Sequence, residues 1–296
     1  RIGMRLSEVA PDLAKQTVAD AVTIGVMSQP EDICLLRHDG SGKNAFKNPL
    51  SFRYLDDNFI ESDAVKIGKT FMDYLKKTKD PRIHVYCSLK DGNTEFDKQF
   101  GLPNGYDSHT IADAPSGSFV GLENTSNFNI NTILRLDAPT IFLMPSETKL
   151  LLAEAVLRNW TNGNAEVLYK EAITSSMKEQ EIAYGTQGKI TDEEIETYLA
   201  QNLLSTANNT EKLQIIGEQY WVATFINGYE SYANWRRTGY PKLIPTNYSG
   251  SMSPGVIPTR LPYPTDEYSI NRANVDTANQ QQGADKVTTH IWWDID

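Results

Sequence analysis

Cysteine and histidine are scarce in this sequence, which argues against a disulfide framework and a metal centre. Cys34 and Cys87 lie 53 positions apart and form neither a C-x-x-C pair nor a zinc-binding spacing. We therefore expect two free thiols. The alternative is a single bridge, which would require Cα atoms within about 7 Å of each other. The four histidines show no i, i+4 or H-x-H relation, and none neighbours a cysteine. The sequence thus predicts no metal-binding residues.

Clustered positive charge and long apolar runs are also missing. The chain has 28 Lys and Arg against 38 Asp and Glu, a net charge of −10, and no basic block. Nucleic acid is therefore not an expected partner, because phosphate binding requires grouped Lys and Arg. The most apolar stretch, residues 141–156, is interrupted by Pro145 and by charged residues. It is too short and too polar to cross a bilayer.

No catalytic or nucleotide-binding motif is present. The sequence lacks G-x-S-x-G, Walker A and G-x-G-x-x-G patterns. The loop Asp91–Asp97 carries oxygen ligands at alternate positions but lacks the glycine and glutamate of an EF-hand, so a solvated turn is favoured over calcium. The adjacent acids Glu193 and Glu194 fall in the first turn of a predicted helix, where the helix dipole accounts for them. We expect no catalytic residues, no metal and no cofactor.

Apolar periodicity and capping residues predict a mostly α-helical chain with far less strand than helix. The predicted helices cover residues 11–25, 62–78, 146–160, 164–182, 191–204 and 210–235. The third and fourth are joined by a short turn and should form an antiparallel hairpin. Ser62 is the predicted cap of the second, and Thr191 with Glu194 forms a capping box for the fifth. The helix at 210–235 is apolar nearly all round, which predicts a central, buried position.

The regions before and after these central helices have weaker patterns. Between residues 83 and 140, short runs such as Ile83–Tyr86 alternate with Gly-, Asn- and Ser-rich stretches, which predicts loops with short strands. After residue 240 the chain is Pro-rich, with one short helix at 271–282 and a strand or extended tail at 288–293. The sequence opens like a helix without its beginning, so we expect it to be the later part of a longer protein.

Several short motifs occur in an order typical of one family. They include W-x-x-x-x-Y-P with a double arginine at 235–241, followed by Ile257–Pro264, Glu267–Asn271, Gly283–Asp285 and Trp292–Asp294. Further matches are Asp80–Arg82, Gly101–Gly105 and Leu152–Ala155. Together these motifs resemble the SusD/RagB-like proteins, the starch-utilisation-system type of outer-membrane glycan-binding lipoproteins. The resemblance covers essentially the whole chain.

The resemblance implies one SusD/RagB-like domain over 1–296, truncated at its amino terminus. Tetratricopeptide-like helical hairpins would pack against an irregular part with few short strands. We expect an irregular insertion at about 83–140, a helical core at 141–240 and an extended tail at 241–296. The family's amino-terminal portion, with its lipoprotein signal and anchoring cysteine, would be missing.

The resemblance also implies a function. Such proteins are not enzymes; they bind a glycan or another nutrient at the cell surface of Bacteroidetes and deliver it to a SusC-like TonB-dependent transporter in the outer membrane. Membrane attachment would be only through a lipid anchor on the missing part. Two alternatives remain open: a helical scaffold that binds only protein, and a glycosidase. The second would need two carboxyl groups about 5–5.5 Å or 6.5–9.5 Å apart.

Aromatic residues in exposed irregular loops are the candidate sugar-stacking platforms. Tyr106, Phe119 and Phe128 meet this criterion, with Asn104, Asp107 and Asn124 as nearby hydrogen-bonding partners. The alternative is that these residues plug the side of the core or face the missing part.

The pair Arg236 and Arg237 also has two interpretations. It could clamp an anionic ligand, but its place at the end of a helix favours a structural role. At least one of the two should pair with a carboxylate or with backbone carbonyls at the end of that helix and so tie it to the Pro-rich tail.

Overall fold

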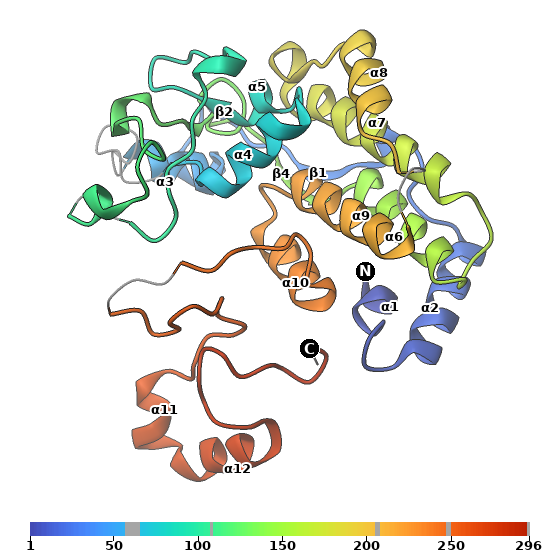
Figure 1. Cartoon of the computed structure of the whole chain (residues 1–296), viewed down its shortest axis with the longest axis vertical. Helices are drawn as coiled ribbons and strands as arrows, with labels where there is room; N and C mark the ends of the chain where they lie inside the picture. The colour runs from blue at the N-terminus through green and yellow to red at the C-terminus, as the bar shows by residue number, and fades with distance from the viewer. Residues whose placement is uncertain (57–65, 107–108, 205–207, 247–249, 295–296) are drawn as a thin grey trace.

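A computed structural model describes residues 1–56, 66–106, 109–204, 208–246 and 250–294 of the chain. Helices dominate and the strands are short, which confirms the expected mostly α-helical fold (Figure 1). The α-helices are α1 (Ile2–Arg5), α2 (Pro11–Ile24), α3 (Pro49–Asp56), α4 (Lys69–Thr78), α5 (Ile83–Tyr86), α6 (Pro145–Leu157), α7 (Ala165–Tyr184), α8 (Asp192–Gln201), α9 (Asn209–Ala223), α10 (Gly228–Thr238), α11 (Thr265–Ile270) and α12 (Arg272–Gln282).

The strands form two small antiparallel pairs, β1 with β4 and β2 with β3. Their bounds are β1 (Cys34–Leu36), β2 (Cys87–Ser88), β3 (Asn127–Phe128) and β4 (Thr140–Leu143). The short 3₁₀ helices are η1 (Pro30–Asp32), η2 (Asn44–Phe46), η3 (Phe96–Lys98), η4 (Ile111–Asp113), η5 (Leu122–Asn124) and η6 (Gly185–Gly188).

Helices α6 and α7 form the antiparallel hairpin that the sequence predicts. At the start of α6, the backbone N–H and hydroxyl of Ser146 donate hydrogen bonds of 2.8 and 2.6 Å to Glu179, near the end of α7. The side chain of Asn164 accepts from the first turn of α7 and caps it. Ala153 and Ala155 are fully buried, which lets neighbouring helices approach closely.

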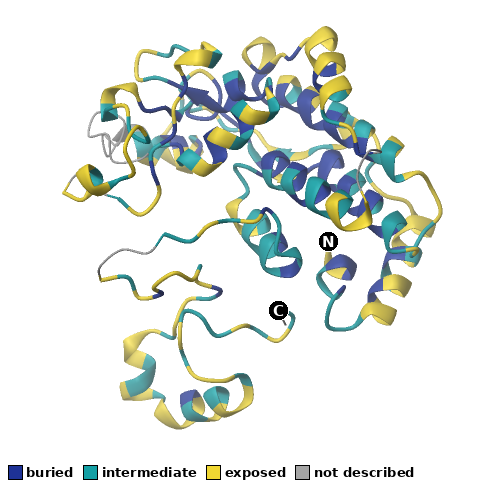
Figure 2. Cartoon of the chain, viewed as in Figure 1, coloured by how far each residue is buried: buried dark blue, intermediate teal, exposed yellow. Residues whose placement is uncertain are grey.

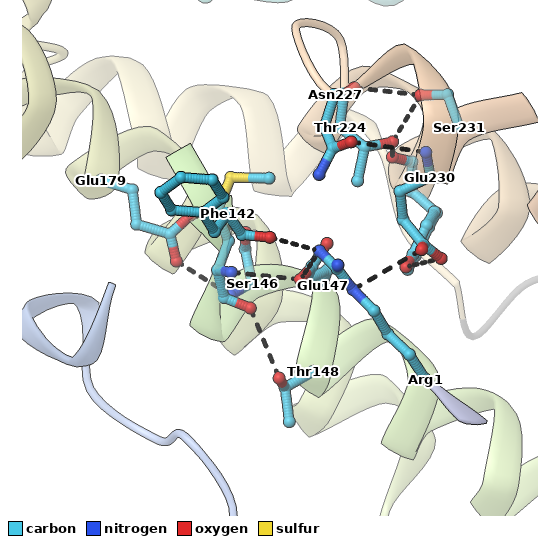
Figure 3. Close-up of polar contacts among 12 residues, drawn as sticks. Arg1, Phe142, Ser146, Glu147, Thr148, Glu179, Thr224, Asn227, Glu230 and Ser231 are labelled. Carbon is cyan, nitrogen blue, oxygen red and sulfur yellow. Dashed lines mark hydrogen bonds and ion pairs between the residues drawn. The ribbon is translucent and has the colours of Figure 1, made fainter. Parts of the chain in front are cut away.

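The predicted helix at 210–235 is in fact two helices, α9 and α10, separated at residues 224–227. The hydroxyl of Thr224 lies 2.7 Å from the Tyr220 carbonyl and 2.6 Å from the hydroxyl of Ser231, which sits on the next helix (Figure 3). Asn227 then caps α10 as a new N-terminus. Side-chain hydrogen bonds therefore satisfy the backbone at the break, although the apolar pattern continues through it.

Helix α4 begins at Lys69, later than predicted, and the predicted cap Ser62 lies outside the described residues. The segment before α4 is extended because its backbone bonds to other segments. Ile67 donates to the carbonyl of Ser126 at 2.8 Å and accepts from the N–H of Leu102 at 2.7 Å. A backbone engaged in this way cannot join the hydrogen-bond ladder of a helix.

The run Ile83–Tyr86, predicted as a strand, is instead the short helix α5. The carboxylate of Asp80 accepts from the backbone N–H of Arg82 at 3.0 Å, and the Asp80 carbonyl accepts from Ile83 at 3.2 Å. These bonds start a helical turn. The strand β2 follows it and pairs with β3.

Arg82 is fully buried and ties this corner to the helical body. Its guanidinium donates to Asp80 at 2.5 and 2.9 Å, to Ser176 on α7 at 3.0 Å and to Gln219 on α9 at 2.8 Å. Burial lowers the pKa of Arg82, but the adjacent Asp80 more than offsets it, so the pKa lies above its usual value. The Asp-Pro-Arg motif is therefore a structural anchor.

The predicted capping box of α8 is confirmed. The hydroxyl oxygen of Thr191 accepts from the Glu194 N–H at 3.3 Å, and the Glu194 carboxylate accepts from the Thr191 N–H at 2.8 Å. Two backbone groups at the start of the helix are thereby satisfied.

Replacing Thr191 by Ala should lower the free energy of unfolding by about 1 kcal/mol, because it removes this cap. Urea unfolding followed by circular dichroism measures the change. The matched control is Thr197→Ala on the exposed face of the same helix. Equal stability of the two variants would contradict the assigned role of the cap.

The two cysteines are free, as expected: Cys34 is exposed and Cys87 is buried. Burial raises the pKa of the Cys87 thiol well above its usual value. This thiol is therefore part of the core.

Beyond residue 241 the chain forms extended segments and the helices α11 and α12, which lie apart from the helical body (Figure 1). Much of this tail is exposed (Figure 2). The helix expected at 271–282 is present as α12, whereas residues 288–293 form no strand in the described chain. The backbone N–H of Thr259 donates to the carbonyl of Val287 at 2.8 Å, and its hydroxyl donates to the carbonyl of Thr289 at 3.1 Å. Two extended parts of the tail therefore lie side by side.

Candidate functional site

The loop-rich region is held on a base of three extended segments near residues 67–69, 100–102 and 125–126. Ser126 donates from its backbone N–H to the Phe100 carbonyl at 2.8 Å, and Lys69 donates to the Leu102 carbonyl at 2.7 Å. At Gly101 the backbones approach so closely that a Cβ would lie 2.4 Å from the Cα of Lys69. Only glycine fits there, so the Gly-Leu-Pro-Asn-Gly motif fixes where the loops emerge.

Asn104 lies where this loop meets both α4 and the tail. Its side-chain oxygen accepts from Thr70 at 3.3 Å, and its carbonyl accepts from the Thr246 hydroxyl at 3.0 Å. Gly105 follows with φ +82°, and any side chain there would collide with Thr246. Asn104 is exposed and Tyr106 is half-buried, whereas Asp107 lies outside the described residues.

Phe119 and Asn124 share the next loop. The ring of Phe119 is half-buried and Asn124 is exposed at the end of η5. The side-chain amide of Asn124 donates to the carbonyl of Val120 at 2.9 Å and to the carboxylate of Glu123 at 3.0 Å. Its N–H groups therefore help to close the loop.

Phe128 is half-buried in an aromatic cluster on β3. Its ring centre lies 5.5 Å from the rings of both Tyr54 and Phe225. Phe225 in turn stacks on Phe71 at 4.3 Å, with ring planes 4° apart. Burial raises the pKa of Tyr54 to about 12. Phe128 thus connects the loop region to the core.

Phe100 is a loop aromatic that the sequence analysis missed. Its side chain is 39% exposed, and the Lys76 ammonium lies 4.1 Å from its ring centre. The sequence could have indicated this residue, because Phe100 directly precedes Gly101 in a glycine-rich loop. It satisfies the criterion that singled out Tyr106.

The structural interpretation of Arg237 is confirmed. Both terminal nitrogens of its buried guanidinium bond to the carboxylate of Glu154, at 2.6 and 2.7 Å, and it also reaches Ser7 and Asn234. Burial raises the pKa of Glu154, but Arg237 and Arg158 together more than offset this, so the pKa lies below its usual value. This pairing joins α10 to α6 and engages the guanidinium within the protein.

Arg236 is structural as well. Its guanidinium lies 4.2 Å from the ring of Tyr232 and 4.7 Å from that of Trp293, and it donates to the Thr259 carbonyl at 3.0 Å. Helix α10 is thereby tied to the tail, as expected. Trp293 packs in this contact, whereas its neighbour Trp292 is 68% exposed.

Two buried carboxylates near α6 bear on the glycosidase alternative. Glu147 is only 2% exposed, bonds to the Arg1 guanidinium and accepts from the Met144 N–H at 3.1 Å (Figure 3). Burial raises its pKa to about 7, against the lowering effect of Arg1. Glu179 is fully buried and bonded to Ser146. Both carboxylates are bonded to neighbouring residues of the chain, which assigns them a structural part. Glu147 also lines a cavity of about 620 Å³ bounded by α1, α2 and α6.

The α6–α7 hairpin, the loop-rich side and the extended tail place this chain among mostly α-helical proteins with tetratricopeptide-like hairpins. Sequence comparison then specifies the family. Residues 1–294 match the SusD-like family model, described as SusD and RagB outer membrane lipoproteins, so the chain belongs to that family. The resemblance inferred from the motifs is thereby confirmed. In the part of the chain that the structure describes, no helix is long and apolar enough to span a membrane.

Solved structures share the fold. A chitin-binding protein is 30% identical, with a TM-score of 0.82, and the match covers 99% of this chain and 62% of that one. A SusD-like protein described as Bacteroidetes AC2a is 25% identical, with a TM-score of 0.83 and coverage of 99% and 67%. A chitin-binding SusD homologue from Flavobacterium johnsoniae has a TM-score of 0.77 at 24% identity, with coverage of 99% and 61%.

This chain therefore spans less than two thirds of the length of the chitin-binding protein that it resembles. Comparison with curated protein sequences gives no significant match.

Proposed function

We propose that this protein is a non-catalytic glycan-binding protein of the outer-membrane surface, which delivers its ligand to a SusC-like TonB-dependent transporter. The observation that carries the proposal is the match of residues 1–294 to the SusD-like family model. A chitin-binding protein at 30% identity makes oligomers of N-acetylglucosamine the first ligands to test. A lipid anchor outside this chain would hold the protein at the membrane.

The loops beside the Gly101 base are the proposed ligand-contacting surface. Tyr106 and Phe119 are partly exposed aromatic residues on two loops that share this base. A ring offers a flat apolar face to the C–H groups of a sugar. The side-chain oxygens of Asn104 and Asn124 would accept hydrogen bonds from hydroxyl groups. Phe128 would hold the loops against the core and would not stack on the sugar, because its ring packs against Tyr54 and Phe225.

The double variant Tyr106→Ala, Phe119→Ala should bind chitotriose at least about tenfold more weakly than the unmodified chain. Isothermal titration calorimetry measures the affinity, and circular dichroism confirms folding. The matched control is Tyr229→Ala, an aromatic residue that is 93% exposed on α10, away from the loops. Its affinity should equal that of the unmodified chain.

Unchanged binding by the double variant would place the ligand elsewhere. If the unmodified chain binds none of chitotriose, cellotriose and maltotriose, the proposal that this chain binds glycans is wrong. Binding to another of the three alone would identify a different glycan.

A further inference from the structure

A cavity of about 350 Å³ lies between α2 and the turn that joins α6 to α7. It is separate from the loops considered above. Its lining comprises Ala19, Val22 and Thr23 from α2, and Asn159, Trp160, Thr161 and Asn162 from the turn. All seven residues are uncharged, so the cavity suits a neutral ligand.

The indole ring of Trp160 is fixed in place by its neighbours. The Arg158 guanidinium lies 5.3 Å from the ring centre. Arg158 is itself anchored by ion pairs with Glu154 at 2.8 Å and Glu8 at 2.6 Å. The backbone N–H of Trp160 also donates to the carbonyl of Ala155 at 2.9 Å. The ring is therefore pre-organised, which lowers the entropy cost of binding a ligand against it.

The polar side chains of the cavity have hydrogen-bonding capacity to spare. Asn159 is exposed and has φ +59°, in the left-handed region that favours glycine. Its amide, the amide of Asn162 and the hydroxyl of Thr161 form no hydrogen bond with any other residue that the structure describes. Two amides supply both donors and acceptors. These groups can pair with hydroxyl or acetamido groups of a ligand.

We propose that this cavity is a second carbohydrate-binding site, which takes one or two sugar rings. Trp160 supplies the stacking face, Asn159 and Asn162 bond the polar substituents, and Val22 contacts the apolar side of the ring. A neutral, polyhydroxylated molecule with an apolar C–H face matches an uncharged lining that combines an indole with amides and hydroxyls. The volume lies at the lower end of the range of roughly 300–1,000 Å³ for small-molecule sites.

This inference rests on the proposed function, because it concerns the same class of ligand. It adds a second point of contact with the glycan, on a helical hairpin instead of the loops. Two sites on one protein can hold a glycan chain more firmly than either alone.

The test uses the full chain with ¹⁵N-labelled tryptophan side chains, titrated with chitotriose. The indole N–H signal of Trp160 is assigned by its loss in Trp160→Phe, and we expect it to shift saturably. Asn162→Ala should raise the Kd read from this signal roughly five- to tenfold, as expected for the loss of one hydrogen bond. The matched control is Asn131→Ala, an exposed asparagine in the loop-rich region that leaves the cavity intact.

The same titration separates failure of this site from failure of the proposed function. If calorimetry shows binding while the Trp160 signal stays fixed, the second site is wrong and the proposed function stands. If the Trp160 signal still saturates in the double variant Tyr106→Ala, Phe119→Ala, the site acts independently of the loops. If the unmodified chain does not bind chitotriose at all, the second site fails together with chitin-type binding.

Discussion

Replacing Arg237 by Met is expected to lower the free energy of unfolding by about 3–5 kcal/mol. The guanidinium is buried and holds the carboxylate of Glu154 with two hydrogen bonds. Its removal leaves Glu154, which is 4% exposed, with Arg158 as its remaining ion-pair partner at 2.8 Å. A buried carboxylate that loses its main counter-charge is strongly destabilising. Urea unfolding at pH 7 measures the change.

Two further variants separate burial from the mere loss of a charge. In Arg237→Met, Glu154→Leu both charges are gone, and most of the lost stability should return, because an apolar pair needs no counter-charge. The surface control is Arg272→Met, which breaks an ion pair whose arginine side chain is 66% exposed. That variant should stay within about 0.5 kcal/mol of the unmodified chain. Equal losses in Arg237→Met and Arg272→Met would contradict the anchoring role.

Features set by neighbouring residues could be predicted from the sequence. The capping box of Thr191 with Glu194 involves residues three positions apart, and it forms as expected. The α6–α7 hairpin follows from two apolar stripes joined by a short turn, with Asn164 as a cap. The structural role of Arg237 was also predictable, because a cation in the last turn of a helix is stabilised by the helix dipole. Its partner Glu154 could not be identified, since 83 positions separate them.

Features set by distant residues could not be predicted. The break between α9 and α10 falls where the hydroxyls of Thr224 and Ser231 bond to each other. It lies inside an apolar pattern that runs on through Phe225, whose ring stacks on Phe71 of α4. The run Ile83–Tyr86 has the composition of a strand, but the buried network of Arg82 with α7 and α9 makes it a helix. In both places, packing between remote segments overrides local propensity.

In the candidate sites, too, the sequence predicts what neighbouring residues determine and not what distant residues determine. Composition indicated which loops expose aromatic residues, but it gave no means to separate Phe128, which meets Tyr54 and Phe225, from Tyr106. The cavity at Trp160 was not predictable either. It forms only because Val22 of α2 lies against a turn nearly 140 positions later in the chain.

The free energy of unfolding should carry a pH-dependent contribution from Glu147 of about 2–3 kcal/mol between pH 5 and pH 8. Burial raises the pKa of this carboxyl to about 7 in the folded chain, from an ordinary value of 4.5. The folded state therefore binds the proton more tightly than the unfolded state does. The stabilising contribution is complete below pH 4.5 and is lost as the pH rises through 7.

Substituting Glu147 by Gln isolates this contribution, because other titrating groups are common to both chains. Unfolding in urea at pH 5, 6, 7 and 8 gives the stability difference between the variant and the unmodified chain. That difference should move in favour of Glu147→Gln by about 2–3 kcal/mol from pH 5 to pH 8. The groups that face Glu147 are the Arg1 guanidinium, the Met144 N–H and, through Arg1, the carboxylate of Glu230 (Figure 3).

Arg1 supplies the second half of the test. Its guanidinium lowers the pKa of Glu147 and so opposes burial. In Arg1→Met the two lowering effects of Arg1 are lost, so burial and the Glu230 carboxylate, which raise the pKa, are opposed only by the hydrogen bond from the Met144 N–H. The midpoint of the pH-dependent change should then move to higher pH. If the stability difference for Glu147→Gln stays constant from pH 5 to pH 8, Glu147 is ionised throughout, and its ion pair with Arg1 outweighs burial.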